Sequence, residues 1–285
     1  MNATARCPGS CGELIQGFVA GRECLVSCTV NLFSEVTLEE VSYFCKEQGP
    51  KKSREALTKS FEFFGLSAED TYNIEIKVNS SIPAGKGMAS STADIVATIR
   101  ASALLVGKEI DHAEVASMAV SIEPTDSVLF PGLTLFDHLE GSIIEPLGSA
   151  PPLDVLVLEP YETLDTLKFR ETDYSEVKRK NQDKIEYALW LLKEGIRTQN
   201  SLLVGEAATI SSIVNEEVLQ KPKLRSIIDC AKKAGAVGVN VAHSGTVIGI
   251  LIDNAYTDAE RVKRLLKREG LLKEFGRVYL CKVLV

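Results

Sequence analysis

A glycine-containing loop lies between two segments of different periodicity, and it constrains the fold more than any other feature of the sequence. Apolar and polar residues alternate over 72–78, as in a half-buried strand, whereas apolar residues recur at helical spacing over 95–105. The connection holds Gly85 and Gly87. A glycine loop at the start of a helix presents free backbone N–H groups at the positive end of the helix dipole. We therefore expect this corner to bind an anion, above all a phosphate group.

The spacing of the loop excludes two common phosphate-binding motifs. No Gly-Lys-Ser/Thr follows where a Walker loop requires it, and Ser90 stands where the dinucleotide fingerprint has its third glycine. The remaining pattern, Pro-x-Gly-x-Gly-x-x-Ser-Ser, resembles the ATP-binding motif of the GHMP kinases. The alternative is a glycine-rich turn without a ligand. Ser91 followed by Asp94 further predicts a capping box at the start of the helix.

The resemblance implies ATP and Mg²⁺ as cofactors, with the triphosphate along the loop. The serine hydroxyls would reach phosphate oxygens or Mg²⁺, and Lys86 would add charge. The residues expected to bind ATP are Pro83, Ala84, Gly85, Lys86, Gly87, Met88, Ala89, Ser90 and Ser91.

The N-terminal segment carries a second motif. Residues 7–17 read Cys-Pro-Gly-Ser-Cys-Gly-Glu-Leu-Ile-Gln-Gly, and Pro-Gly predicts a break between strands. The segment resembles the first GHMP motif, and it is most similar to one branch, the L-threonine kinases of adenosylcobalamin synthesis. A plain β-turn is the alternative. The resemblance implies a position near the substrate, with Ser10, Cys11 and Glu13 as substrate-binding residues.

A third segment, 242–247, stands between two strand-like runs and reads Ala-His-Ser-Gly-Thr-Val. GHMP kinases have a glycine-rich turn at this place, which packs against the phosphate loop and shapes the substrate site. The resemblance implies His243 and Ser244 as substrate-binding residues. The alternative is a tight turn with an exposed histidine, since Gly245 is the one glycine in it.

Two carboxylates follow a helix predicted over 113–120, which Asp111 caps. Glu123 and Asp126 flank Pro124, and such a pair suits metal binding and proton transfer. The resemblance implies Asp126 as the catalytic base and Glu123 as a catalytic residue that binds Mg²⁺ together with Ser91. An Asp-Ser turn and an ordinary helix-end glutamate are the alternatives.

The overall charge limits the partners. The 285 residues carry a formal charge of −7 with a pI near 5.2, which argues against nucleic acid and anionic membranes. No apolar run is long enough to span a membrane, and the N-terminus has no signal-peptide core. We expect a cytoplasmic protein whose partners are ATP and a small-molecule substrate, and this interpretation also allows a homodimer.

Seven cysteines raise the question of a metal site, because Cys7/Cys11 and Cys24/Cys28 share the same spacing. Cys24 and Cys28 lie in a strand-like run and would face the same side. We therefore predict reduced cysteines that fill the core.

The order of predicted elements indicates an α+β chain with two domains. Strands are expected at 23–33, 35–41, 133–136 and 142–144, and a helix at 51–65. The second half predicts a strand at 154–158, helices at 174–194, 201–215 and 221–234, then a β-β-α-β run, which is the ferredoxin-like split motif. We place the boundary at the turn-rich 148–152. The resemblance implies an N-terminal domain, 1–150, like ribosomal protein S5 domain 2, and a ferredoxin-like C-terminal domain, 151–285.

The sequence thus predicts an ATP-dependent phosphotransferase for a small hydroxyl compound. The N-terminal motif implies L-threonine as acceptor, giving O-phospho-L-threonine for the aminopropanol linker of adenosylcobalamin. Homoserine or another metabolite of this superfamily is the alternative within the class. A non-catalytic nucleotide or metabolite sensor on the same fold is the alternative outside it. Arg6 and Ser10 are candidates for binding the substrate carboxylate, although Arg6 could equally be a structural surface residue.

Overall fold

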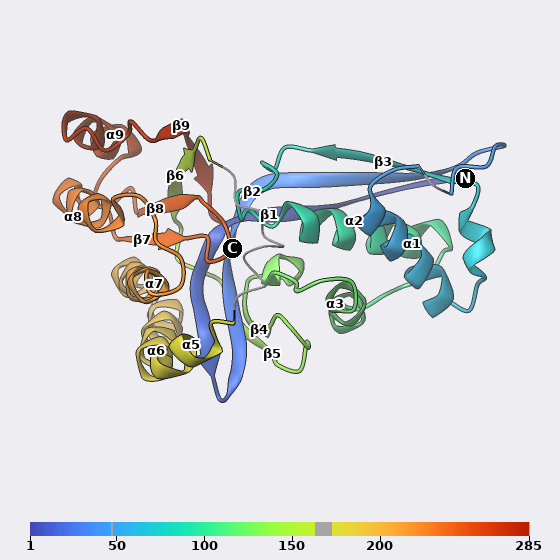
Figure 1. Ribbon diagram of the computed structural model, residues 1–285, viewed down its shortest axis with the longest axis horizontal. Coiled ribbons are helices and arrows are strands. Elements are labelled where there is room, and N and C mark those ends of the chain that lie inside the picture. The colour runs from blue at the N-terminus through green and yellow to red at the C-terminus, as the bar shows by residue number, and fades with distance from the viewer. Residues whose placement is uncertain (47, 163–172, 285) are drawn as a thin grey trace.

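The computed structural model describes residues 1–46, 48–162 and 173–284. A long antiparallel hairpin is its central feature, formed by β1 (Asn2–Val19) and β2 (Arg22–Glu40) (Figure 1). Ala20 and Gly21 join the two strands with φ angles of 50° and 76°, as a tight two-residue hairpin turn requires. The hairpin extends from the N-terminal helices to the helices of the second half, so both halves of the chain share it.

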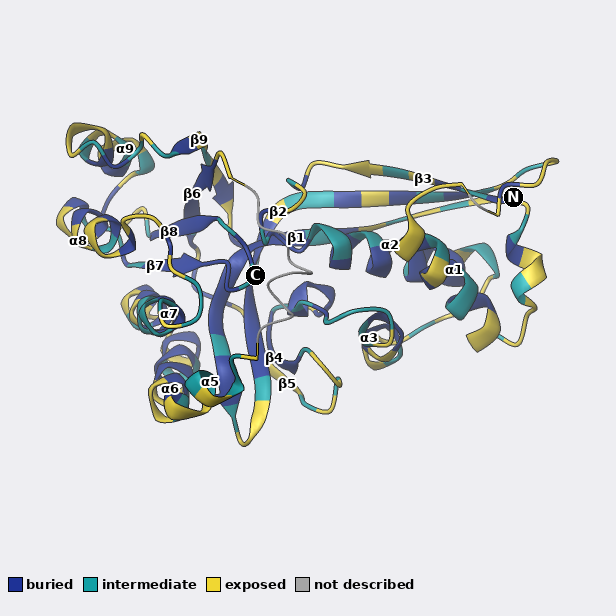
Figure 2. Ribbon diagram, viewed as in Figure 1, coloured by how far each residue is buried: buried dark blue, intermediate teal, exposed yellow. Residues whose placement is uncertain are grey.

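In the first half, helices cover one face of this hairpin. α2 (Ser90–Leu105) packs on β1 and β2, and α1 (Lys51–Phe63) packs on α2. Most residues of α2 are buried because neighbours surround it (Figure 2). The other elements here are β3 (Ile74–Ser80), α3 (His112–Val120), β4 (Leu133–Asp137) and β5 (Ile144–Gly148), with 3₁₀ turns at Ala68–Thr71 and Ser127–Leu129.

The second half forms the expected split motif. Its sheet has the order β7-β8-β6-β9 with antiparallel neighbours, which confirms the ferredoxin-like arrangement. Its elements are β6 (Asp154–Pro160), α5 (Ser175–Lys180), α6 (Gln182–Thr198), α7 (Ser201–Asn215), α8 (Leu224–Ala234), β7 (Gly238–Val241), β8 (Ile248–Ile252), α9 (Ala259–Arg268) and β9 (Phe275–Lys282).

Strand β6 separates two hydrophobic cores. Val155 and Val157 belong to the larger core, which also contains residues of β1, β2 and α2. Leu156 and Leu158 point to the opposite face, where α8 and α9 cover a smaller core. Successive side chains of a strand alternate between faces, so a continuous apolar run can fill both cores.

The two halves are joined through one sheet among the described residues. Its strand order is β5-β4-β2-β1-β7-β8-β6-β9, with β3 paired to β2, and the junction is the pairing of Glu13 in β1 with Val241 in β7. The domain boundary between residues 150 and 151 stays a prediction. None of the helices in the described part of the chain is sufficiently long and apolar to cross a membrane.

Several expected boundaries are wrong. The Pro8-Gly9 pair does not end a strand; β1 continues through it with a register shift between the two residues. β2 is likewise one strand where two were expected. The helix expected over 174–194 is divided at Asn181, where the backbone leaves helical geometry between α5 and α6.

The start of α2 also differs from the expected capping box. Its N-cap is Ala89, with a positive φ of 60° and no side-chain cap. Asp94 instead accepts a hydrogen bond from Ser34 on β2. The cap predicted at Asp111 is confirmed, since its carboxylate accepts from the N–H of Glu114 at 2.8 Å.

Candidate active site

The glycine loop lies between the end of β3 and the first turn of α2, as predicted. Gly85, Gly87 and Ala89 all have positive φ angles, 69°, 76° and 60°. These angles curl the loop around a cavity of about 120 Å³ at the helix N-terminus. The residues that line it are Lys52, Gly85, Gly87, Met88, Ala89, Ser90, Ser91, Thr92, Glu123, Pro124, Asp126 and Ser244.

The third segment packs directly on this loop. A Cβ atom on Gly87 would lie 2.6 Å from both Cα of Gly245 and Cβ of Ala242, so the contact requires glycine. The N–H of Thr246 also donates to the Lys86 carbonyl at 3.0 Å. The turn therefore lies against the loop despite its low glycine content.

The Lys86 side chain does not line the cavity. It is buried, and its ammonium donates to the carbonyls of Pro160 at 2.7 Å and Glu162 at 2.6 Å, at the end of β6. Lys86 was expected to add charge at the loop, but its ammonium points away from the cavity to these carbonyls. Its ammonium joins the loop to the second half of the chain.

A lysine in the charged run at the start of α1 reaches the cavity. Lys52 Nζ donates to the hydroxyl of Ser91 at 3.1 Å and forms an ion pair with Glu123. Ser91 and Glu123 thus lie on either side of one positive charge. This is the arrangement that a cation shared by the two residues would need.

Asp126 lies at the junction of two cavities. Thr92, in the first turn of α2, donates its hydroxyl hydrogen to Oδ2 of Asp126 at 3.1 Å. Burial raises the pKa of Asp126 to about 7, and the negative charge of Glu13 adds to this effect. A carboxyl group that titrates near neutral pH is suited to accept a proton from a substrate hydroxyl.

Glu13 comes from β1, where irregular pairing on both sides of it turns the side chain inward. Burial raises its pKa to about 7 as well. The hydrogen bond from the backbone N–H of His243, at 2.9 Å, acts in the opposite direction and lowers the pKa. The charge of Glu13 in turn raises the pKa of Asp126. The two carboxyl groups therefore form a coupled pair, in which loss of one proton opposes loss of the other.

His243 fixes the position of Glu13. Its Nδ1 lies 3.1 Å from Glu13 Oε2 and 3.2 Å from the Val241 carbonyl, which can only accept, so Nδ1 carries the hydrogen. Nε2 then accepts from the Ser211 hydroxyl at 3.2 Å. Burial lowers the pKa of His243 to about 3, which keeps the ring neutral. The histidine is therefore enclosed by protein rather than exposed.

A second cavity, of about 430 Å³, opens beside the first and is called here the acceptor cavity. It shares Pro124, Asp126 and Ser244 with the loop cavity. Its full lining is Glu13, Gln16, Glu23, Leu25, Pro124, Asp126, His138, Leu139, Asp173, Tyr174, Ser175, Lys178 and Ser244. A phosphate group on the loop and a small molecule in this cavity would meet at Asp126.

Two other residues of the N-terminal motif, Ser10 and Cys11, contact the elements around the cavities rather than lining the acceptor cavity. The N–H of Ser10 donates to the Met88 carbonyl at 3.0 Å, while its buried hydroxyl has no hydrogen-bond partner among the described residues. The Cys11 carbonyl accepts from the Asn240 side chain. Neither side chain lines the acceptor cavity. Arg6 lies over the Phe33 ring, 4.7 Å from its centre, and is likewise not part of that lining.

The cysteines fill the core, as predicted. All seven are free and buried, and burial raises the pKa of Cys7, Cys24 and Cys28 to about 12. In the part of the chain that the structure describes, no three His, Cys, Asp or Glu side chains cluster as a metal site.

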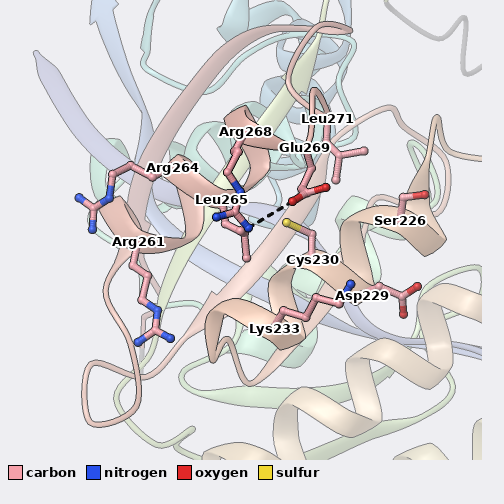
Figure 3. Close-up of a pocket in the computed structure, with 10 residues that line it drawn as sticks. All are labelled: Ser226, Asp229, Cys230, Lys233, Arg261, Arg264, Leu265, Arg268, Glu269 and Leu271. Carbon is pink, nitrogen blue, oxygen red and sulfur yellow. Dashed lines mark hydrogen bonds and ion pairs between the residues drawn. The ribbon is translucent and has the colours of Figure 1, made fainter.

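A further hollow of about 850 Å³ lies between α8 and α9 (Figure 3). Arg261, Arg264 and Lys233 give it basic side chains, and Arg268 pairs with its neighbour Glu269 at the end of α9 at 3.3 Å. None of its lining residues belongs to the loop cavity or the acceptor cavity.

Sequence reasoning missed several residues of the site. Thr92 follows the serine pair directly and could have been found as the next hydroxyl of the loop motif. Lys52 and Lys178 stand in charged runs that look like any solvated helix face. Glu23 and His138 carry no local signal, because the fold alone brings them together.

The fold, with a glycine loop at a helix N-terminus and two adjoining cavities, is that of a phosphotransferase class. Comparison with known proteins agrees. The model of the GHMP kinases N-terminal domain matches residues 52–130, and that of the GHMP kinases C-terminal domain matches residues 192–270. The chain belongs to the GHMP kinases, a family of ATP-using enzymes, and its predicted two-domain α+β fold is confirmed.

Relatives cover almost the whole chain. An L-threonine kinase of Salmonella typhimurium is 38% identical over 99% of this chain and 93% of that protein. An L-threonine kinase of Citrobacter freundii is 38% identical over 99% and 97%. Among solved structures, the homoserine kinase from Cytophaga hutchinsonii has a TM-score of 0.74 at 18% identity, with 99% and 95% of the two chains covered. At that identity it shows the fold alone.

Proposed function

We propose that this kinase transfers the γ-phosphoryl group of ATP to the hydroxyl of L-threonine, giving O-phospho-L-threonine for the aminopropanol linker of adenosylcobalamin. The observation that carries the proposal is that the loop cavity and the acceptor cavity meet at Asp126. The identity with two L-threonine kinases over nearly the full length supports threonine as the acceptor. The acceptor cavity, about 430 Å³, suits a small amino acid.

The loop would bind the triphosphate through its backbone. The positive φ angles at Gly85 and Gly87 and the N-terminus of α2 favour an anion at this corner. The Ser90 and Ser91 side chains would add hydroxyl donors. Catalysis in phosphoryl transfer comes mainly from positioning and from neutralising charge, so this rigid cradle is the first requirement.

Asp126 would accept the hydroxyl proton of threonine as the new P–O bond forms and the bond to ADP breaks. Thr92 holds the carboxylate in one orientation, and Glu13 keeps its pKa near neutrality. Glu13 acts through Asp126, and His243 acts through Glu13, so both are positioning residues in this proposal. Ser10 would hold the glycine loop through its backbone hydrogen bond to Met88, and Cys11 would hold β1 through the bond from Asn240.

Mg²⁺ would be held by Ser91 and Glu123. The residues fit a cation, since the Lys52 ammonium already contacts both side chains. When bound, the ion would neutralise negative charge on the phosphates. Lys52 would then move from Ser91 and Glu123 to the phosphate oxygens.

The proposal includes a cytoplasmic location and the seven reduced cysteines agree with it, because thiols persist in reducing compartments. A homodimer stays a prediction, which size-exclusion chromatography with light scattering tests directly.

Release of ADP from Mg-ATP, measured against L-threonine, D-threonine, L-serine, L-homoserine and mevalonate, tests the proposal. We expect turnover confined to L-threonine. Turnover with L-homoserine alone would favour the second candidate function, homoserine kinase. A homoserine kinase of Bacillus pumilus is 25% identical to this chain. ATP binding without turnover on any acceptor would favour the sensor.

A further inference from the structure

Three ionisable side chains form a cluster on one wall of the acceptor cavity. Glu23 comes from the start of β2, His138 follows the end of β4, and Lys178 lies in α5. Glu23 Oε1 pairs with the Lys178 ammonium and lies 3.6 Å from His138 Nε2. Three elements far apart in sequence thus place two basic groups around one carboxylate.

This cluster has unused capacity for a second anion. Burial disfavours the charged form of Glu23, yet the contacts with His138 and Lys178 lower its pKa to about 2. Glu23 is therefore fully ionised. A lysine ammonium has three N–H donors, so Lys178 can hold Glu23 and donate to another group. His138 Nε2 is buried and forms no hydrogen bond in the described ranges, because its contact with Glu23 Oε1, at 3.6 Å, is longer than a hydrogen bond.

The rest of the cavity would repel a carboxylate. Glu13, Asp126 and Asp173 line it elsewhere, and all are acidic. A molecule that carries both a hydroxyl and a carboxylate is favoured in the orientation that keeps its carboxylate away from these three acidic side chains. Its hydroxyl lies toward Asp126, and its carboxylate lies at the basic pair.

We propose that Lys178 and His138 bind the α-carboxylate of the acceptor and that Glu23 holds these two side chains in position. The inference rests on the proposed function and deepens it, because it names the acceptor as a hydroxyl compound with a free carboxylate. Hydroxyl compounds without a carboxylate lose this contact. Serine, homoserine and mevalonate retain it, so the cluster selects for the carboxylate and does not distinguish among these acceptors.

Lys178→Met and the matched control Lys180→Met test this inference. Lys180 belongs to the same short helix, is exposed and lies outside the cavity lining. Each variant is assayed for KM and kcat with L-threonine, and for the inhibition constant of L-threonine amide, which lacks the carboxylate charge. We expect Lys178→Met to raise KM for L-threonine about 10- to 100-fold, with little change in kcat. Its inhibition constant for the amide should remain that of the wild type.

Two further variants separate a binding role from a structural one. Lys178→Arg keeps the positive charge and should recover most of the affinity for L-threonine, whereas His138→Asn should weaken L-threonine and leave the amide unaffected. An equal loss for L-threonine and its amide in Lys178→Met would overturn the inference. So would an unchanged KM in a wild-type-like fold.

Failure of the proposed function gives a different result. The wild type would then not phosphorylate L-threonine at all. In that case the comparison is repeated with the acceptor that the substrate panel identifies. That acceptor replaces L-threonine, and its uncharged amide or ester replaces L-threonine amide. Equal sensitivity of both forms to Lys178→Met would then reject the carboxylate site by itself.

Discussion

The Thr92 hydroxyl donates a hydrogen bond of 3.1 Å to Oδ2 of Asp126 and accepts one of 3.3 Å from the backbone N–H of the same residue. This pair of bonds ties the carboxylate to the first turn of α2, the helix whose N-terminus carries the phosphate loop. The group that would take the proton and the groups that would hold the phosphate therefore move as one unit. Such coupling maintains the alignment on which phosphoryl transfer depends.

Asp126→Asn should lower kcat about 10²- to 10⁴-fold, because an amide cannot accept the hydroxyl proton. Steady-state ADP release measures the effect. Asp94→Asn is the control, since Asp94 is a carboxylate on α2, near Thr92, that lines neither cavity. A loss confined to KM would identify Asp126 as a substrate-binding group instead.

The pH dependence of kcat/KM should show an acidic limb near pH 7. Asp126 and Glu13 both have pKa values raised to about 7, so Asp126 is protonated below that pH and cannot act as a base. Activity should therefore rise as pH increases through about 7. Glu13→Gln removes the neighbouring negative charge and should move this limb to lower pH. A limb that Glu13→Gln leaves in place would show that the two groups do not interact.

Ser91→Ala should reduce kcat on the order of 10²-fold while the fold survives, because the nucleotide and its metal ion lose a ligand. Ser91→Thr keeps the hydroxyl and should retain most of the activity. Circular dichroism checks the fold, and a Mg²⁺ titration measures the metal requirement. Near-normal turnover of the alanine variant would remove Ser91 from the site.

Gly87→Ala should destabilise the protein by about 1–3 kcal/mol more than Gly107→Ala does. Both glycines have positive φ, 76° and 66°, so both variants carry backbone strain. A Cβ on Gly87 meets Gly245 and Ala242 at 2.6 Å, whereas one on Gly107 meets nothing within 4 Å. Urea unfolding measures the difference. Equal losses would mean that the loop separates from the turn without cost.

Lys86→Met should lower the free energy of unfolding by about 1–3 kcal/mol, because buried carbonyls at the end of β6 lose their donor. Lys180→Met, at an exposed site, is the control for removing a charge. Unchanged stability together with a raised KM for ATP would instead place this ammonium on the phosphates.

Local sequence was sufficient to predict the parts of the site that depend on local conformation. Gly85 and Gly87 predicted a turn at a helix start, and both lie in a turn before α2, where their φ angles are positive. Alternation and helical spacing located most strands and helices. Trp190, in contrast, lies in a helical pattern that favours a core or domain-packing role, yet it is 57% exposed and stacked on Tyr187, with ring centres 5.9 Å apart. Helical spacing shows which residues share a face but not which face the rest of the chain covers.

The sequence by itself determined the loop, the order of elements and the family, because these depend on neighbours in the chain. The tertiary structure alone decided that Lys86 faces β6, that Lys52 reaches Glu123, and that Glu23, His138 and Lys178 share one wall. The physical reason is that a charged side chain takes its partner, its burial and its pKa from groups that folding brings within a few ångströms. Those distances do not exist until the sheet and its helices have packed.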